Sequence, residues 1–548
     1  MAVGRTTTKG AVISKPSIVR STAMMSTATT LSRLTGFLRI WATAYALGAS
    51  GLMSAYSVAN NIPNMIFELV AGGIISSLFI PSFMELRETQ SDETAWKFAS
   101  HVFNLAVLAL GVLAVIGTLF PQPFIWTQTF RAAAGSAQVT DSATFFFRYF
   151  AIQVVIYGAG SVISGLLNSE RRYFWPAVGP IFNNVVAIAT MLAYQALHTN
   201  VHAANIVLAV GTTLAVVVMF GVQVPALLKT GWRYSFGLGL SDPALRRMLR
   251  LAVPTVIYVI TNLVTVSFRN ASALAASAKG VSVLTYAWVF YQLPYGILAV
   301  ALATAVFTEL AEAAGKKDWT TFKDTFGRGL RATGILMLPT SALLITLATP
   351  LVSLYRVGRF QQSDVAIVAS ALRWWAVGLI FYAGTMFVLR TFYSLKDTRT
   401  PMLVNLATSV LQIALYVLLT TGAGGWAGLG INGIPIADTV FFALTFSILA
   451  WLLRTRIGGY DFRGVATTLL RMLAASAIAA SLAWGIACLL EPVLGGVSGA
   501  LLQVSVAGVA GLVIAFALGR AFGVVEISVV TSLFGRTVTR LLPRKESH

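Results

Sequence analysis

Two arginines in the first apolar segment have the residue type and spacing of a phosphate-binding pair. Arg33 and Arg39 lie in the stretch LSRLTGFLRI, inside an apolar run from Met24 to Leu47. On an α-helix they would be separated by about 9 Å of rise and about 120° of rotation, with Gly36 midway between them. One helix face can therefore present both guanidinium groups, and the glycine would let a bulky ligand approach.

A third arginine and a single carboxylate also fall deep within apolar segments, at Arg269 and Glu68. A charged side chain at the bilayer centre costs at least about 2.5–3.5 kcal/mol, so it should face protein or a water-filled cavity. Three cations outnumber one anion, and guanidinium groups suit phosphate because their planar fork can hold two oxygens. The surplus favours an anionic ligand, and an internal salt-bridge cluster is the alternative interpretation.

The composition predicts that membrane-spanning helices position these residues. The 548-residue chain is 57% hydrophobic and 11% charged, whereas soluble domains are roughly 45–50% apolar and about 25% charged. Apolar segments of about 20 residues, the length that crosses a bilayer, recur along the whole chain. We predict an all-α integral membrane protein with fourteen spans, at 23–49, 53–82, 99–121, 142–168, 176–197, 203–228, 248–277, 281–310, 329–354, 364–393, 400–421, 429–453, 466–490 and 497–520.

The basic residues predict the orientation of these spans. Most of the 39 lysines and arginines fall in loops that face the cytoplasm if both termini do, as the positive-inside rule requires. The net charge of +20 is then a topology signal with anionic lipid headgroups as contacts, and nucleic acid is not an expected partner. The first apolar run is too long, and lacks the cleavage site, for a removable signal peptide.

An internal repeat predicts how the spans are grouped. Arg148 aligns with Arg373, and Arg171 aligns with Lys396, which pairs spans four and five with ten and eleven. NNIPNM likewise aligns with YQLPYG and pairs spans two and eight. Six spans separate the copies, an even number, so the halves share one orientation, as in transporters that bind substrate between two lobes.

The predicted organisation is two six-helix lobes followed by two extra helices that are rich in small residues. Its ranges are 1–22 for a cytoplasmic N-terminal tail, 23–228 for the first lobe, 229–250 for a cytoplasmic linker and the start of helix seven, 251–453 for the second lobe, 454–520 for the extra helices and 521–548 for a basic cytoplasmic tail.

The residues that enzymes use do not form a recognisable catalytic or metal site. His198 and His202 have one-turn spacing, but HTNVH lacks the glutamate of a zinc protease motif. Cys488 is the only cysteine, so no intrachain disulfide can form. The embedded acids, chiefly Glu68 and Asp438, do not make the acidic site of a membrane glycosyltransferase. We therefore expect no catalytic residue, metal or cofactor.

Five motifs, spread in order along nearly the whole chain, resemble the MurJ/MviN lipid II flippases of the MOP transporter superfamily. They are LSRLTGFLR, NNIPNMIF…AGGIISSLFIPSF, LLNSERRYFWPA, LYRVGRFQQSDV and FYSLKDTRTPM. The resemblance implies a bacterial cytoplasmic membrane protein with an inward-facing cavity, whose arginines bind the pyrophosphate of lipid-linked peptidoglycan precursor. It also implies a groove on the two extra helices that takes the polyprenyl tail.

The resemblance assigns residues to this headgroup site and also shows departures. Arg33 and Arg39 match the cation positions of the family's first helix. The full predicted set is Arg33, Gly36, Arg39, Asn60, Asn61 and Arg269, with Glu68 as a coupling group or ion-pair partner. Ser54 stands where the family usually has aspartate, Phe67 and Glu68 where it has basic residues, and Trp288 and Val289 where it has an Asp-Arg pair. Arg269 could supply the missing cation of the second lobe.

Three functions are compatible with these observations. The first is a lipid II flippase that moves its substrate to the outer leaflet by alternating access. The second is an exporter of another lipid-linked oligosaccharide or of drugs, and the third is a non-transporting scaffold for cell-wall assembly. The extra helix pair favours the first. Its expected partners are the lipid-linked precursor, membrane lipids, the cell-wall synthesis machinery and a coupling cation. Glu68 is expected to pair with Arg39 or Arg269 when no substrate is bound.

Overall fold

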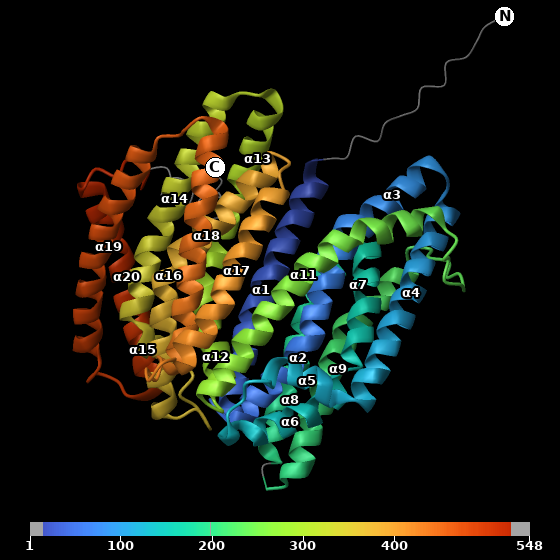
Figure 1. Cartoon of the computed structure of the whole chain (residues 1–548), viewed down its shortest axis with the longest axis horizontal. Coiled ribbons are helices and arrows are strands. Elements are labelled where there is room, and N and C mark those ends of the chain that lie inside the picture. Colours follow the sequence, from blue (N-terminus) through green and yellow to red (C-terminus); the bar gives the residue numbers. More distant parts are fainter. Residues whose placement is uncertain (1–14, 198, 528–548) are drawn as a thin grey trace, which may run out of the picture. The chain divides into compact units, whose positions relative to one another are not determined.

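The computed structural model describes residues 15–197 and 199–527. Within these ranges every regular element is a helix (Figure 1). The predicted all-α architecture is therefore confirmed for the described part of the chain. Residues 1–14 and 528–548 of the two predicted tails lie outside it.

The helices follow one another with short connections along the chain. Their bounds are α1 (Lys15–Leu47), α2 (Gly51–Phe67), η1 (Glu68–Phe79), α3 (Ile80–Thr89), α4 (Asp92–Leu119), α5 (Pro121–Thr129), η2 (Ala134–Ser136), α6 (Ala137–Phe150), α7 (Gln153–Ser169), α8 (Phe174–Ala196), α9 (Val201–Gly221), α10 (Val224–Leu228), α11 (Pro243–Ala276), α12 (Gly280–Pro294), η3 (Tyr295–Ala299), α13 (Val300–Lys316), α14 (Trp319–Thr346), α15 (Ala348–Ser353), α16 (Gln362–Ser394), α17 (Arg399–Thr421), η4 (Gly430–Asn432), α18 (Gly433–Ile457), α19 (Phe462–Leu490) and α20 (Gly496–Ala521).

All fourteen predicted spans coincide with helices, or with consecutive helices, of the described chain. Ten helices there are long and apolar enough to cross a membrane, and α6 with α7 makes an eleventh span if their 44° bend is a break within one span. The other three predicted spans lie on α1, on α2 with η1 and α3, and on α11. These three carry the embedded charged residues Arg33, Arg39, Glu68 and Arg269.

Several helices begin at side-chain caps beside the predicted spans. Ser91 Oγ accepts from the Thr94 amide at 3.1 Å at the start of α4, and Asp461 Oδ1 accepts from the Gly464 amide at 2.9 Å at the start of α19. Such caps satisfy backbone amides that a helix leaves without intrahelical partners. The polar loops therefore fix where these apolar helices begin.

Two irregularities of the backbone occur at equivalent positions in both copies of the internal repeat. Arg171 and Lys396, which align in the repeat, both have a φ of 57° in the left-handed region. NNIPNM precedes the π-helix η1, and its counterpart YQLPYG leads into the π-helix η3. π-Helical turns are rare and occur frequently at functional sites. Matched irregularities at aligned positions support two copies of one helix arrangement.

The helices group into two compact units, and each is described by itself. Described residues of the first unit lie within Met1–Thr43, Asn60–Pro121 and Phe146–Ile257. Those of the second unit lie within Ala44–Ala59, Gln122–Phe145 and Tyr258–His548.

The core of the first unit is a cluster of aromatic and aliphatic side chains on η1, α3, α4 and α7. Phe79 stacks on Phe98 with ring centroids 5.8 Å apart. Gly165 on α7 allows that helix to approach η1, because a Cβ at this position would lie only 2.6 Å from Ile75 Cγ2. Small residues permit the same close approach at many membrane helix interfaces.

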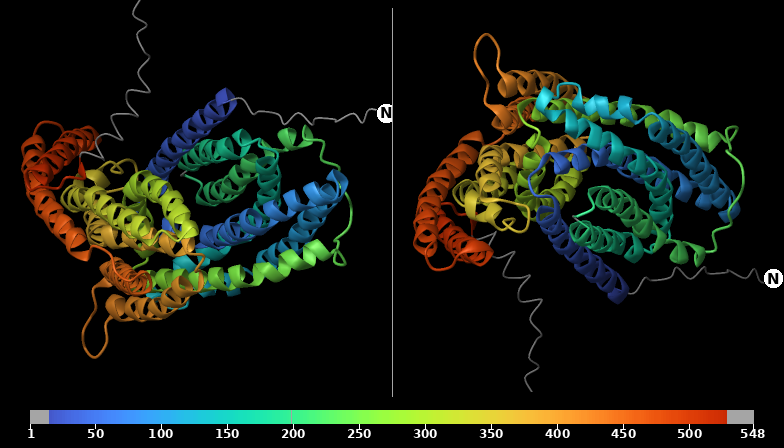
Figure 2. Two further views of the ribbon diagram at one scale, coloured as in Figure 1. Left: turned by 90° about the horizontal axis from the view of Figure 1, so that it is seen from above. Right: turned by 90° about the horizontal axis from the view of Figure 1, so that it is seen from below.

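The second unit has a core on α13, α14, α16 and α18, and a smaller cluster that joins α14 to α19 and α20. In that smaller cluster, Gly511 lies against Leu343, with 2.5 Å between an added Cβ and Leu343 Cδ2. Ala483 and Ala507 are fully buried beside them. Figure 2 shows α19 and α20 side by side at one edge of this unit. The small residues of the two extra helices therefore serve close packing.

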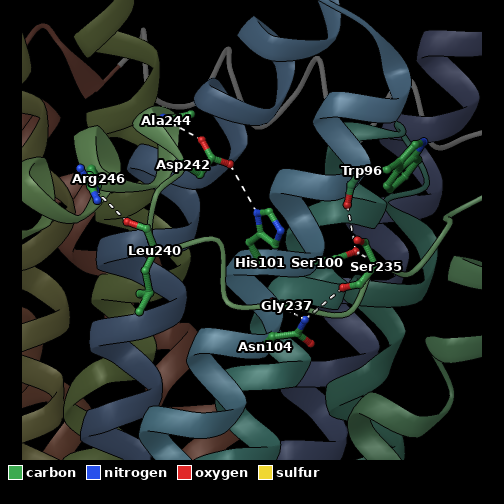
Figure 3. A network of polar contacts seen from close by, with 10 residues as sticks. All are labelled: Trp96, Ser100, His101, Asn104, Ser235, Gly237, Leu240, Asp242, Ala244 and Arg246. Atoms are coloured by element: carbon green, nitrogen blue, oxygen red, sulfur yellow. Dashed lines mark hydrogen bonds and ion pairs between the residues drawn. The ribbon is translucent and has the colours of Figure 1, made fainter.

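A non-helical stretch at 229–242 is fastened to α4 within the first unit (Figure 3). Asn104 Nδ2 donates to the carbonyl oxygens of Ser235, at 3.1 Å, and Gly237, at 2.8 Å. His101 Nδ1 lies 3.4 Å from Asp242 Oδ2, directly before α11 begins. The stretch is thus held by specific polar contacts where it enters the helix that carries Arg269.

Candidate functional site

The predicted pair of arginines lies on α1, in the first unit. Arg33 is exposed, and Arg39 is half-buried. No carboxylate among the described residues forms an ion pair with either guanidinium group. Two cations on one membrane helix are therefore not neutralised by this part of the chain, and they can receive an anion.

An amide pair on α8 positions this face of α1. Arg39 Nη1 donates to Asn183 Oδ1 at 3.4 Å. Asn184 Nδ2 donates to the Ser32 carbonyl at 3.2 Å and to Thr35 Oγ1 at 3.0 Å. These asparagines were not predicted from the sequence, although two adjacent amides inside an apolar span are a signal that could have found them.

The space around Gly36 is large enough for a side-chain Cβ, so close helix packing does not explain the glycine. The atom nearest to a Cβ added there is Asn184 Nδ2, at an ordinary contact distance of 3.7 Å. Contact with α8 alone therefore does not demand a glycine. Its predicted use, to let a ligand approach between the arginines, stays a prediction.

The three asparagines of the NNIPNM motif, of which Asn60 and Asn61 were predicted for the site, differ in their contacts. Asn64 Oδ1 accepts from the Tyr157 hydroxyl at 2.8 Å, which ties α2 to α7. Asn60 and Asn61 are half-buried. Neither of these two side chains has a hydrogen bond to any described residue. Asn64 is thus used by the fold, whereas Asn60 and Asn61 keep polar groups for another partner.

Glu68 is the first residue of η1, and its side chain is exposed. It forms no ion pair with a described residue. The expected pairing with Arg39 is therefore not seen, because the Arg39 guanidinium bonds to Asn183 instead. The described part of the first unit thus gives neither the cations of α1 nor this carboxylate an ionic partner.

Arg269 lies on α11 in the second unit, where it is half-buried. Its guanidinium carbon is 5.8 Å from the ring centroid of Trp288 on α12, a cation–π distance. Its Nε is buried without a hydrogen-bond partner among the described residues. Trp288 stands where the family has a charged residue, and its ring contacts the cation Arg269 of the neighbouring helix α11.

Asp438 on α18 anchors a buried polar cluster in the same unit and is only 3% exposed. Its carboxylate accepts hydrogen bonds from Trp375 Nε1 at 2.8 Å, from Gln412 Nε2 at 2.7 Å and from the Tyr416 hydroxyl. The Arg269 guanidinium also interacts electrostatically with this carboxylate. Sequence reasoning noted Asp438 only as an embedded acid, because its partners come from three other helices.

Ser54, which stands where the family usually has an aspartate, lies in a closed contact between two helices. It is fully buried, and its hydroxyl oxygen accepts from the Ser282 amide at 3.1 Å. Both residues belong to the second unit, where the bond joins α2 to α12. A small neutral hydroxyl fits this closed helix contact, whereas a carboxylate would need a buried cation.

Asp397 explains the FYSLKDTRTPM motif as a helix start. Its carboxylate accepts from the amides of Arg399 and Thr400, both at 3.1 Å, before α17, and it pairs with Arg456. Burial alone would raise the pKa of Asp397, but the hydrogen bonds from Thr400 and the Arg456 guanidinium hold it below its usual value. The motif therefore has a structural use outside the spans.

Metal chemistry finds no support in the described residues. They contain no group of three or more His, Cys, Asp or Glu side chains that could hold a metal ion. His198 of the HTNVH pair lies outside the described residues. The described spans do present guanidinium and amide side chains, on which the predicted anion site rests.

Comparisons with known proteins place most of the chain in one family. Residues 43–506 match the family model of the lipid II flippase MurJ. A probable lipid II flippase MurJ from Rhizobium meliloti is 30% identical over 446 residues, which cover 79% of this chain and 81% of the relative. A lipid II flippase MurJ from Burkholderia cenocepacia is 28% identical over 411 residues, which cover 73% and 78%.

Solved structures share the fold. A lipid II flippase MurJ in an inward closed conformation has a TM-score of 0.74 at 20% identity, over 91% of this chain and 99% of that one. An inward-facing multidrug resistance MATE family transporter of the MOP superfamily has a TM-score of 0.65 at 17% identity, over 79% and 94%. The family match begins after Arg33 and Arg39, so their role stays a prediction. With most of its length matched, this multi-pass membrane chain belongs to the MurJ lipid II flippase family.

Proposed function

We propose that this chain translocates lipid II from the inner to the outer leaflet of the bacterial cytoplasmic membrane, for cell-wall synthesis. The observation that carries the proposal is the match of residues 43–506 to the lipid II flippase family. The cations on α1, which have no carboxylate partner in the described part of the chain, suit the pyrophosphate of such a substrate. The chain acts as a transporter and not as an enzyme.

Arg33 and Arg39 are proposed as the pyrophosphate clamp. The bond from Arg39 to Asn183 is long, at 3.4 Å, and its acceptor is neutral. A phosphate carries negative charge as well as acceptor oxygens, and it can accept from two N–H groups of one guanidinium, so a phosphate oxygen can replace this amide. Gly36 leaves space between the two cations, and Asn60 and Asn61 offer amides to the remainder of the headgroup.

Arg269 is proposed as the cation that the second unit contributes to anion recognition. Trp288 holds one face of its guanidinium group, and Asp438 balances part of its charge. The proposal includes two six-helix lobes that alternate in access, with both termini in the cytoplasm. Membrane lipids, a coupling cation and the cell-wall synthesis machinery are its proposed partners.

Glu68 is proposed as the coupling group. An exposed carboxylate within a predicted span can take up a proton or a sodium ion, and an affinity that differs between two conformations would link that ion to transport. Glu68→Gln should keep headgroup binding and weaken the dependence of transport on the ion gradient. If Glu68→Gln lowers only the yield of folded protein and leaves coupling unchanged, Glu68 has a structural role instead.

Two other functions deserve a direct comparison. Similarity to a MATE fold favours an exporter of a drug or of another lipid-linked oligosaccharide, and the missing family charges at Ser54 and Trp288 favour a scaffold without transport. These functions can be distinguished by growth of a bacterium that expresses this chain after its own flippase has been depleted. Growth is expected for a lipid II flippase. Absence of growth at normal membrane levels, with or without drug efflux, would contradict it.

A further inference from the structure

A polar cavity of about 370 Å³ lies at the α19–α20 loop, and its lining contains none of the residues assigned to the headgroup. It is entirely within the second unit, between the end of α14, the short helix α15, the start of α16 and the facing ends of α19 and α20. Its polar lining includes Arg356, Arg373, Thr349, Gln362, Gln503 and Glu491.

The two arginines of this cavity have neutral partners. Arg373 Nη2 donates to Thr349 Oγ1 at 2.7 Å, and its Nε donates to the Ile345 carbonyl at 3.4 Å. Arg356 Nη1 donates to Gln362 Oε1 at 2.8 Å. These bonds orient the guanidinium groups but leave their charges uncompensated, so the cavity retains an attraction for anions.

The acid of the lining does not cancel this charge. Glu491 is the one carboxylate among the lining residues. Neither Glu491 nor the two arginines forms an ion pair with a described residue. Two cations and one anion therefore leave the lining with a net positive charge.

The start of α20 adds accessible backbone amides to the same cavity. Gly495, Gly496 and Gly499 all contribute to the lining, and Arg356 Nη2 lies 3.8 Å from the position of a Cβ on Gly496. The Gly499 amide bonds to the Gly495 carbonyl at 3.3 Å. The amides just before it lack an acceptor within the helix, and the N-terminal end of a helix favours negative charge.

We propose that this cavity binds a phosphate group, carried either by a lipid headgroup or by free phosphate. Two oriented guanidinium groups, hydroxyl and amide side chains, and exposed backbone amides match the oxygens of a phosphate. Two large apolar side chains that line the cavity are exposed, Trp484 at 60% and Leu494 at 47%. These apolar surfaces are placed to lie along the acyl chains of a lipid whose headgroup enters the cavity. The inference does not depend on lipid II transport.

The cavity contains its own reporter, because Cys488 is the only cysteine of the chain, is exposed and belongs to the lining. The full chain in maltoside micelles, which contain no phosphate, would be alkylated with a maleimide. The probes are phosphatidylglycerol, diacylglycerol as a lipid without phosphate, and inorganic phosphate. We expect at least about a threefold slower alkylation with a phosphate-bearing probe and no slowing with diacylglycerol.

Protection by phosphatidylglycerol alone would identify a headgroup, and protection by inorganic phosphate as well would identify a general phosphate site. The double variant R356Q/R373Q should lose the protection, whereas Arg454→Gln, which removes an arginine stacked on Phe462 outside the lining, should keep it. If the double variant does not fold, R356Q and R373Q are measured singly, and each should weaken protection. Equal alkylation with all probes, or protection that persists without the arginines, would overturn the proposal.

Discussion

The charged groups of α1 and the charged cluster around Asp438 differ in whether the described protein supplies partners for charges in membrane helices. Both place ionised side chains on predicted membrane helices. Arg33 and Arg39 have no carboxylate partner among the described residues, and Arg39 has one long bond to an amide. Asp438 is buried, accepts three hydrogen bonds and has the cation Arg269 near it.

This difference separates a charge that serves the fold from a charge that is available to a ligand. Removal of one member of a satisfied buried cluster leaves the other groups without partners, so the cost appears in stability. Removal of an arginine that the protein does not neutralise leaves the fold almost unchanged, so the cost appears in binding. Variants in the two regions should therefore fail in different assays.

The largest expected effect on folding is at Asp438. Asp438→Ala would leave Arg269 and three hydrogen-bond donors without their acceptor, and we expect a loss of about 3–5 kcal/mol of stability. Thermal unfolding of the purified protein and the yield of folded protein in membranes would measure it. Asp438→Asn, which keeps an acceptor oxygen, should lose less. Wild-type stability in Asp438→Ala would show that the cluster is not structural.

The corresponding change in the first region is Arg39→Ala. We expect normal membrane levels and a loss of about 1.5–3 kcal/mol of headgroup affinity, the value of a hydrogen bond to a charged group. Arg33→Ala should be similar or milder, because that side chain is more exposed. Binding of soluble headgroup pyrophosphate measures the effect. If Arg39→Ala lowers the amount of folded protein and leaves headgroup affinity unchanged, Arg39 stabilises the fold and does not bind the headgroup.

A smaller effect is expected for Arg39→Lys. Lysine keeps the positive charge but lacks the planar fork that can contact two phosphate oxygens together. We predict flipping between that of wild type and Arg39→Ala in liposomes with matched amounts of protein. Equal rates for arginine and lysine would mean that charge alone suffices in the first region.

The smallest effect concerns Asp397, an acid bonded as fully as Asp438 but located outside the spans. Its lowered pKa means that its ionised form stabilises the fold above the unfolded-state pKa of about 3.9, and that this contribution is lost as the pH falls through the lower folded-state pKa. The Arg456 side chain is 48% exposed, so we expect about 1 kcal/mol or less.

Thermal unfolding between pH 6 and pH 3 tests this expectation. Asp397→Asn should be less stable than wild type at pH 6, and the difference should shrink below about pH 4. If Asp397→Asn loses as much stability as Asp438→Ala, then burial within the membrane is not what makes the removal of a carboxylate destabilising.

The sequence predicted the fold well because long apolar segments and loop charges are local signals. All fourteen predicted spans coincide with helices, and the repeat alignment foresaw matched positions such as Arg171 and Lys396. Arg33 and Arg39 could be singled out from the sequence because arginines are conspicuous on an apolar helix. Their availability was not visible, since it depends on which side chains of other helices reach them.

The remaining features depend on contacts between segments far apart in the chain. Asn183 and Asn184 approach α1 only when α8 packs beside it, and the partners of Asp438 come from α11, α16 and α17. The π-helix that begins at Glu68 has no simple sequence signal either. The Glu68–Arg39 ion pair, one of the two pairings expected for Glu68, is not formed among the described residues, because opposite charges on two predicted spans do not determine which atoms meet.

The most direct test of the account is lipid II flipping in liposomes by the wild-type chain and by the double variant R33A/R39A. Fluorescent lipid II that reaches the outer face would be quenched from outside, and thermal unfolding would confirm that both proteins are folded. We predict transfer by the wild type and at least about a tenfold slower transfer by the variant at equal stability. Wild-type transfer by the double variant would contradict the arginine clamp, and no transfer by the wild-type chain would contradict the flippase itself.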